Sequence, residues 1–390
     1  MPGTLTKLTV SAQLLAHALG RRLRGELEPP PDLDAFRQGF QQLLDRVPAD
    51  TFAEVRWCRL AANAPPWVES GLQLSPGEEA SYFICGRTTV VGALDIWVDP
   101  RIQVWSKVGA AGEVTRATRE SHSFTAPHAG PLLFGNYFPN HWADRSGALG
   151  DDEKVYKPLK GGYQVLLIRW PGTAREGLAM LQQAGDVDGR IAAEIERIDQ
   201  GDTRPRGWHY FWGIGEAEVF RDAQREDGAH CIDCHTHRDV GILQHEVDLE
   251  LTPDTAIDWQ WRVDELPSEF REDAVPSHDY LSIAIEFDNG RDITYYWSRS
   301  LPVGTGYDCP LPGWKGKEYH VVVRSGLEGL GAWHDEQRNL YGDYLVYMGE
   351  PPGRIVRIWL IANRVFQRQR GRCSYGGIRL SDGRGVVEVC

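Results

Sequence analysis

The sequence predicts a mainly β protein that contains two antiparallel sandwiches. Between Ile257 and Val263 every second residue is apolar, which is the period of a strand with one buried face. Alternating runs at 281–287 and 293–297 flank Asp288-Asn289-Gly290, and Asn-Gly between two such runs is a strong hairpin signal. Short strand-like runs separated by turn residues recur between 78 and 168, which favours a second antiparallel sandwich.

The length of 390 residues favours more than one domain. In chain order we expect a helical N-terminal segment at 1–52, a lectin-like β-sandwich at 53–172, a helical connector at 173–206 and a second β-sandwich at 207–390. Within the second sandwich, a helix is expected over about 332–348, with Trp333 and Tyr344 facing inward.

Charge and hydropathy argue against two kinds of partner. The chain has 55 acidic and 42 basic residues, a net charge of −13, so nucleic acid is not an expected partner. No apolar run approaches the ~20 residues of a membrane span, so no membrane partner is expected. The interrupted apolar run before Arg21 favours a mature helix and a cytoplasmic protein, whereas cleavage near Ala16-His17-Ala18 would indicate a periplasmic or secreted one.

Four strings in the first half resemble the galactose-binding sandwich of bacterial lectins of the PA-I type, over about residues 60–170. They are Pro66-Trp67-Val68-Glu69-Ser70-Gly71, Ser75-Pro76-Gly77-Glu78, the run 130–136 (GPLLFGN) and the run 142–147 (WADRSG). The resemblance implies a loop in which Asn136, Asn140 and Asp144 correspond to calcium and sugar ligands. Because the carboxylates are too few for the six to eight oxygens of a calcium site, a structural loop is the preferred interpretation.

The C-terminal region resembles an uncharacterised bacterial family, the domain of unknown function 3047, over about residues 245–380. The matching strings are WQWRV at 259–263, HDY at 278–280, YWS at 296–298, VVRSG at 322–326, LGAW at 330–333, EQRN at 336–339 and DY at 343–344. The resemblance implies a jelly-roll-like β-sandwich with one helix, and it brings no established activity. At 362–367 the chain has ANRVFQ where the family tends to have Asp and Thr, so a site built on those carboxylates is not expected.

The string His230-Cys231-Ile232-Asp233-Cys234-His235-Thr236-His237 is the most specific chemical signal. Its preferred interpretation is a turn with buried cysteines. A second is a zinc site of Cys231, Cys234 and His235 or His237, completed by His230, His245 or Cys309. A third is covalent haem c at Cys-x-x-Cys-His.

Two functional hypotheses from different classes remain. The first is a non-redox acid–base enzyme, of lyase, isomerase or hydrolase type, acting on a small organic or sugar-like substrate in an aromatic-lined cleft. Its candidate catalytic residues are His278, Asp279, Glu336 and Arg324, although Arg324 and Glu336 are more simply an ion pair between helix and sheet. Its candidate ligand-binding residues are Trp212, Trp259, Trp261, Tyr296 and Trp297. The alternative is a non-catalytic protein that binds a carbohydrate or another small ligand.

Overall fold

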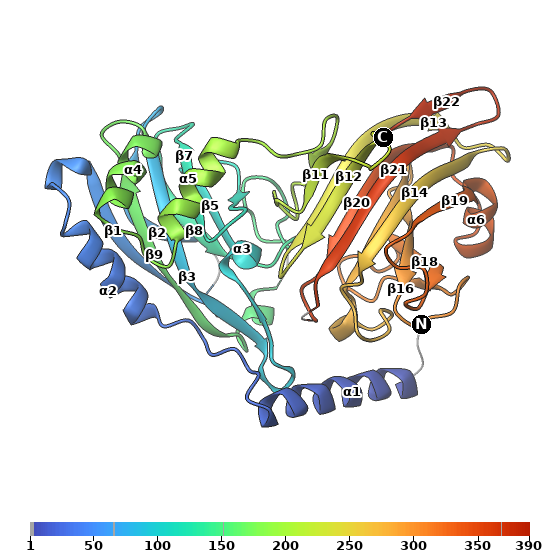
Figure 1. Ribbon diagram of the computed structural model, residues 1–390, viewed down its shortest axis with the longest axis horizontal. Coiled ribbons are helices and arrows are strands. Elements are labelled where there is room, and N and C mark those ends of the chain that lie inside the picture. Colours follow the sequence, from blue (N-terminus) through green and yellow to red (C-terminus); the bar gives the residue numbers. More distant parts are fainter. Residues whose placement is uncertain (1–3, 65–66, 151, 368) are drawn as a thin grey trace. The chain divides into compact units, whose positions relative to one another are not determined.

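The computed structural model describes residues 4–64, 67–150, 152–367 and 369–390, so Pro66 of the lectin-like string lies outside the described residues. The chain divides into two compact units (Figure 1). The first is Gly20–Asp202. The second is Thr203–Cys390 together with the N-terminal residues up to Leu19, so helix α1 (Thr4–Leu23) contributes to both. Each unit is built on two β-sheets, and the predicted mainly β fold is confirmed.

The first unit contains a five-stranded and a four-stranded sheet, in the orders β1-β9-β3-β4, with β7 also paired to β3, and β2-β8-β5-β6. The strands are β1 (Glu54–Ala61), β2 (Trp67–Leu74), β3 (Glu79–Val91), β4 (Ile96–Val98), β5 (Val104–Val108), β6 (Thr115–Arg116), β7 (Ser121–Thr125), β8 (Gly130–Asn136) and β9 (Lys160–Arg169). Leu72, Phe134 and Val165 belong to the apolar core that both sheets share, because alternate residues of each strand face inward.

Three helices cover the second face of the five-stranded sheet: α2 (Leu33–Leu44), α4 (Ala174–Ala184) and α5 (Arg190–Gln200). Phe40 of α2 packs against Phe83 of β3, which is the apolar stripe that the sequence predicts. Helices α4 and α5, expected as a connector, belong to the first unit. The shorter helical segments are η1 (Ala49–Thr51), η2 (Gly92–Leu94), α3 (Pro100–Gln103) and η3 (Glu153–Tyr156).

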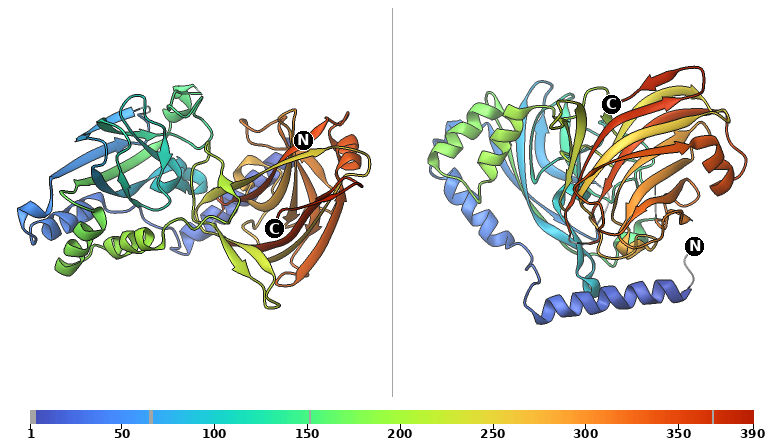
Figure 2. Two further views of the ribbon diagram at one scale, coloured as in Figure 1. Left: turned by 90° about the horizontal axis from the view of Figure 1, so that it is seen from above. Right: turned by 45° about the vertical axis from the view of Figure 1, so that its right-hand side comes forward.

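The second unit is a sandwich of a seven-stranded and a six-stranded sheet (Figure 2). The seven-stranded sheet has the order β10 (His209–Tyr210), β13 (Val240–Glu250), β20 (Arg354–Asn363), β15 (Tyr280–Phe287), β16 (Asp292–Ser298), β18 (Glu318–Ser325) and β17 (Gly306–Asp308). The six-stranded sheet has the order β11 (Phe220–Gln224), β12 (His230–Thr236), β21 (Gly371–Ser381), β14 (Ala256–Glu265) and β19 (Trp333–Asn339), with β22 (Val386–Glu388) paired to β21. The short helices are η4 (Val275–Ser277) and α6 (Leu340–Tyr347).

The predicted hairpin is confirmed, since β15 and β16 pair antiparallel from Glu286 opposite Asp292. Only Gly290 of its turn has positive φ, at 72°, so one αL residue rather than two closes the loop. Strand β16 also pairs parallel with β18, which is an exception within otherwise antiparallel sheets.

The expected helix over 332–348 is wrong in its first half. Trp333–Asn339 is strand β19, paired with β14 so that Glu336 lies opposite Trp259. The helix is confined to α6, which begins where the Asn339 side chain accepts a hydrogen bond from the Gly342 backbone N–H. Pairing with the exposed edge of β14 therefore outweighs the helical pattern. Among the described residues, no helix is long and apolar enough to cross a membrane.

Candidate functional site

The cysteine–histidine string lies on strand β12 rather than in a turn. Cys234 faces the core of the sandwich, opposite Cys373 of β21. Cys231 faces the other side, with its Sγ 3.9 Å from a carboxylate oxygen of Asp233. His235 is exposed, and His237 follows the end of the strand.

This geometry does not fit the zinc or the haem site considered from the sequence. Residues three apart on a strand project from opposite faces, so the thiols of Cys231 and Cys234 do not share an ion. A covalent haem needs both thiols to reach one porphyrin, and the strand separates them. The two cysteines are therefore structural, as the preferred interpretation held, but within a strand.

A pocket of about 390 Å³ lies on the outer face of the six-stranded sheet, over the same strand. Five of its side chains stand directly opposite one another across five neighbouring strands. They are Arg221 of β11, Asp233 of β12, Ser374 of β21, Arg262 of β14 and Trp333 of β19. We call these five residues the arginine row. Because partners in register project from the same face, the row forms a continuous surface in the pocket.

The charges of this pocket are only partly paired. Arg262 donates to Asp264 at 2.8 Å, and the guanidinium of Arg225 lies 4.2 Å from the ring centre of Trp333. Arg221 of the row and the adjacent Arg372 make no side-chain hydrogen bond or ion pair with any residue that the structure describes. The pocket therefore presents two guanidinium groups that are available to an anionic ligand.

Four of the five aromatic residues expected to bind ligand are core residues. Trp259, Trp261 and Trp297 lie between the sheets and are at most 2% exposed, and Tyr296 is fully buried with its hydroxyl 2.9 Å from that of Tyr307. They present no face to a ligand from solution. Trp212 is half-buried beside Phe211.

The expected catalytic pair His278 and Asp279 is fully buried. Asp279 accepts hydrogen bonds from the backbone N–H groups of Val365, Phe366 and Gln367, so it anchors the segment that follows β20. Burial raises the pKa of Asp279 to about 7, against the lowering effect of these hydrogen bonds. The carboxylate therefore has a structural task and no path to a substrate.

His278 belongs to a polar cluster beside the seven-stranded sheet. Its Nδ1 lies 2.6 Å from the carbonyl oxygen of Glu272, and its Nε2 lies 3.5 Å from the Sγ of Cys309. The ring of His320 packs edge-on against it, with centres 4.8 Å apart. Burial, together with His320, lowers the pKa of His278 to about 3, so the imidazole is neutral at physiological pH.

Arg324 and Glu336 form an ion pair, as the simpler interpretation expected. Both residues lie on strands, so the pair joins β18 of one sheet to β19 of the other rather than a helix to a sheet. Glu336 also accepts a hydrogen bond of 3.1 Å from the indole N–H of Trp261. Since both groups are engaged with each other, they do not complete an acid–base site with His278.

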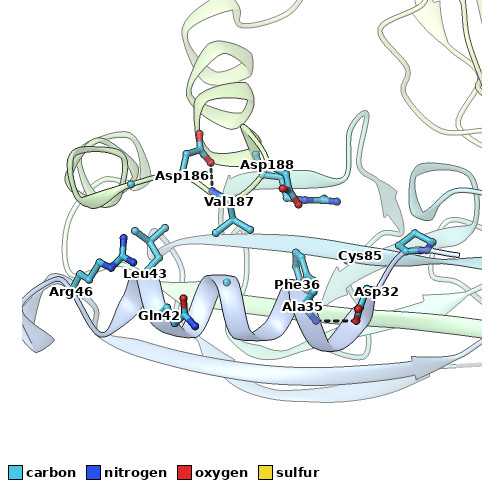
Figure 3. Close-up of a pocket in the computed structure, with 14 residues that line it drawn as sticks. Asp32, Ala35, Phe36, Gln42, Leu43, Arg46, Cys85, Asp186, Val187 and Asp188 are labelled. Atoms are coloured by element: carbon cyan, nitrogen blue, oxygen red, sulfur yellow. Dashed lines mark hydrogen bonds between the residues drawn. The ribbon is translucent and has the colours of Figure 1, made fainter. Parts of the chain in front are cut away.

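A second pocket, of about 480 Å³, lies in the first unit between α2 and the segment that joins α4 to α5 (Figure 3). Two of its three carboxylates are occupied by backbone groups. Asp32 accepts from the N–H groups of Asp34 and Ala35, and Asp186 accepts from those of Val187, Ile191 and Ala192. These two acids serve as helix caps, so they are not available to a ligand.

The lectin-like loop of the first unit has a structural role. Asn136 is buried and donates to the carbonyl oxygen of Ala61, and Asp144 accepts from the N–H and hydroxyl of Ser146. These contacts agree with the structural interpretation of the loop.

The comparisons with known proteins locate one family. Residues 213–379 match the model of a protein family of unknown function, DUF3047, which confirms the resemblance of the C-terminal region. None of the curated proteins matches the chain.

Solved structures with similar folds include three carbohydrate-related proteins. The N-terminal domain of EclA, a PllA-like lectin, is 15% identical over 29% of this chain and 95% of its own, with a TM-score of 0.23. The xyloglucanase domain of NopAA from Sinorhizobium fredii is 6% identical over 48% and 97%, with a TM-score of 0.28. A family 11 carbohydrate-binding module from Clostridium thermocellum is 12% identical over 45% and 88%, with a TM-score of 0.24.

Sequence reasoning missed the arginines of the pocket and the partners of His278. Arg221, Arg262 and Arg372 lie on three strands, so no local spacing joins them. Cys309 was considered only as a partner of the β12 string, and His320 was not considered. The alternation of β18, which places Glu318 and His320 on one face, was the available signal.

Proposed function

We propose that the pocket over the arginine row binds an acidic, sugar-like small molecule, and that the protein acts as a ligand-binding protein. The observation that carries this proposal is the pair of guanidinium groups of Arg221 and Arg372, which have no partner among the described residues and line one pocket. Guanidinium groups bind carboxylate, phosphate and sulfate through two parallel hydrogen bonds. The lining contains four arginines and four carboxylates, so an anion would be attracted by the two unpaired guanidinium groups and not by the net charge of the pocket.

The remaining side chains of the row suit hydroxyl groups and an apolar ring face. The Ser374 hydroxyl donates to Asp233 at 2.5 Å, which leaves the second carboxylate oxygen of Asp233 as an acceptor. The half-buried indole of Trp333 contributes rigid apolar surface at the end of the row. A sugar that carries an acidic group combines these three kinds of chemistry.

Binding is favoured over catalysis because the four residues expected to be catalytic do not converge on an accessible cleft. His278 and Asp279 are fully buried, and Arg324 and Glu336 neutralise each other. An acid–base enzyme needs such groups within hydrogen-bond reach of a substrate.

The test is a titration of the full chain by isothermal calorimetry. The ligands are neutral oligosaccharides, uronic acid oligosaccharides and sugar phosphates. We expect binding of the acidic ligands only, weakening as salt is added because the contacts are ionic. Arg372→Gln and Arg221→Gln should each weaken binding about tenfold or more, since a hydrogen bond to a charged group contributes about 1.5–3 kcal/mol.

Arg379→Gln is the matched control. Arg379 is exposed on the same strand as Arg372 but does not line the pocket, so its loss should leave the affinity unchanged. Equal binding of neutral sugars, an equal effect of Arg379→Gln, or no binding across the whole panel would each contradict the proposal.

A further inference from the structure

The cluster around His278 brings together three residues that favour a metal ion. The side chains are those of His278, which precedes β15, Cys309, which follows β17, and His320 of β18. One ligand atom from each lies within 4.8 Å of the other two, and all three residues are at most 1% exposed. The chain brings these groups together from distant positions in the sequence.

Two features of His278 are typical of a histidine that binds a metal ion. A carbonyl oxygen only accepts, so the Nδ1 of His278 must carry the proton that it shares with Glu272, and its Nε2 lone pair points to the Cys309 sulfur. This backbone contact is the outer-shell partner that metal-bound histidines commonly have. It fixes the ring in the tautomer and orientation that a metal ion requires.

His320 supplies the second, independent observation. Both of its ring nitrogens are buried and make no hydrogen bond with any described residue. Its Nε2 lies 3.2 Å from Glu318 Oε1, close enough for electrostatic attraction but without hydrogen-bond alignment. The imidazole is held instead by ring contacts, stacked on Tyr307 and edge-on to Tyr280. A buried imidazole without hydrogen bonds is unfavourable, and a metal bond to either nitrogen would satisfy it.

We propose that His278, Cys309 and His320 bind a zinc ion buried beside the outer face of the seven-stranded sheet. Imidazole and thiolate are the ligands that zinc prefers, and tetrahedral bonds of about 2.0–2.3 Å place ligand atoms roughly 3.5 Å apart. The observed upper separation of 4.8 Å requires the three side chains to close only slightly around an ion.

The charge of the surroundings agrees with a divalent ion. On binding, the Cys309 thiol loses its proton to solvent and forms a sulfur–zinc bond, with no change of oxidation state. The thiolate and the Glu318 carboxylate together balance the two positive charges. Glu318 is itself held by hydrogen bonds from the hydroxyls of Tyr280 and Thr294. The ion would therefore be neutralised within the protein and would fasten the segments around Cys309 and His278 to the sheet.

The experiment uses the full chain after dialysis against a chelator. Zinc is titrated, and the content is measured by mass spectrometry of the metal after gel filtration, with one zinc per chain expected. Cobalt(II) in place of zinc should give the intense visible bands of tetrahedral coordination and a thiolate charge-transfer band. Cys309→Ser should remove that band and weaken zinc binding roughly 100-fold, because it removes a direct ligand.

Two cysteine variants serve as controls. Cys373→Ser changes a buried cysteine in the core of the same unit, and Cys231→Ser changes the cysteine–histidine string on β12. Both should retain one zinc and the cobalt spectrum. Loss of the ion in Cys231→Ser, its retention in Cys309→Ser, stoichiometric copper in place of zinc, or no metal at all would overturn the proposal.

The wild-type chain decides the question if Cys309→Ser does not fold. Bound zinc should protect Cys309 from alkylation under mild denaturation far more strongly than it protects Cys234 and Cys373, buried cysteines of the same unit that zinc protects only by stabilising the fold. Identical alkylation of Cys309 in both conditions would overturn the proposal.

Discussion

The two units differ in what they bury against the larger of their sheets. In the first unit, α2, α4 and α5 cover the five-stranded sheet with apolar side chains such as Phe40, Leu178 and Ile191. In the second unit, the seven-stranded sheet carries buried Asp292, Glu318 and His320 on one face of β16 and β18. An apolar layer requires only a matching shape, whereas each buried polar group requires its own partner. Around these three residues, the arrangement of the second unit therefore depends on specific polar partners.

Even the buried carboxylates of the two units are stabilised differently. Burial raises the pKa of Glu194 in the first unit, but its ion pair with Arg197 and its hydrogen bond from Ser121 outweigh burial, and the net shift is downward. Glu272 in the second unit pairs with no cation among the described residues and accepts from the hydroxyls of Ser268 and Ser298 and from the N–H of Arg299. Burial raises the pKa of Glu272 to about 7. At Glu272 the buried acid is therefore stabilised by hydrogen bonding rather than by charge pairing.

The largest expected effect is at Asp279. Asp279→Ala leaves three backbone N–H groups after β20 without their acceptor, and it should lower the free energy of unfolding of the second unit by about 3–5 kcal/mol. Urea denaturation followed by tryptophan fluorescence measures the change. Asp258→Ala removes one exposed contact to Gln337 and should cost less than about 1 kcal/mol. Equal losses of unfolding free energy in the two variants would contradict the greater contribution of buried polar groups to the stability of the second unit.

An intermediate effect is expected from Glu272 as the pH rises. Its folded pKa of about 7 lies above the ordinary value of 4.5, so the unfolded chain releases this proton more readily. The contribution of Glu272 to the free energy of unfolding is complete below pH 4.5. It is lost as the pH rises through 7, by about 3 kcal/mol in total. Unfolding free energies measured from pH 4.5 to 8 should therefore fall less steeply in Glu272→Gln than in the wild type. Parallel curves would contradict this assignment.

The smallest effect, with the opposite sign, is expected from His122 of the first unit. Burial and then Arg197 lower its pKa to about 4, and its Nδ1 is buried without a described partner. The folded protein favours the neutral imidazole. The contribution of His122 to the free energy of unfolding is therefore present above pH 6.5 and is lost as the pH falls through 4. Because the side chain is partly exposed, we expect about 1–2 kcal/mol. When the free energy of unfolding is measured against pH, His122→Phe should reduce its fall at acid pH and leave its values above pH 7 unchanged. An unaltered fall at acid pH would contradict the role of His122.

Local patterns were sufficient to predict most strands. The alternation around Trp259 and the turn at Asn289-Gly290 predicted a half-buried strand and a hairpin, because period and turn geometry are local properties. The stretch 333–339 was predicted as helix because its residues carry weak local preferences. Whether this stretch forms a helix or a strand depended on β14, which lies about 75 residues earlier in the chain and has an edge with which the stretch can pair.

The candidate sites were much less predictable. Cys231-x-x-Cys234 has the spacing of a metal ligand pair, but the strand turns the two thiols to opposite faces. His320 has no distinctive spacing to either Cys309 or His278, yet the fold brings all three side chains into one buried group. The arginine row likewise depends on the register of five strands.

The amino-acid sequence by itself determined the β-rich class, the hairpin, the apolar stripes of the helices and the similarity of the C-terminal region to the DUF3047 family model. Only the tertiary structure decided which polar side chains meet. The reason is that secondary structure follows from interactions between near neighbours, whereas a binding site is assembled from residues whose distance in space is set by strand order, register and the segments packed on the sheets.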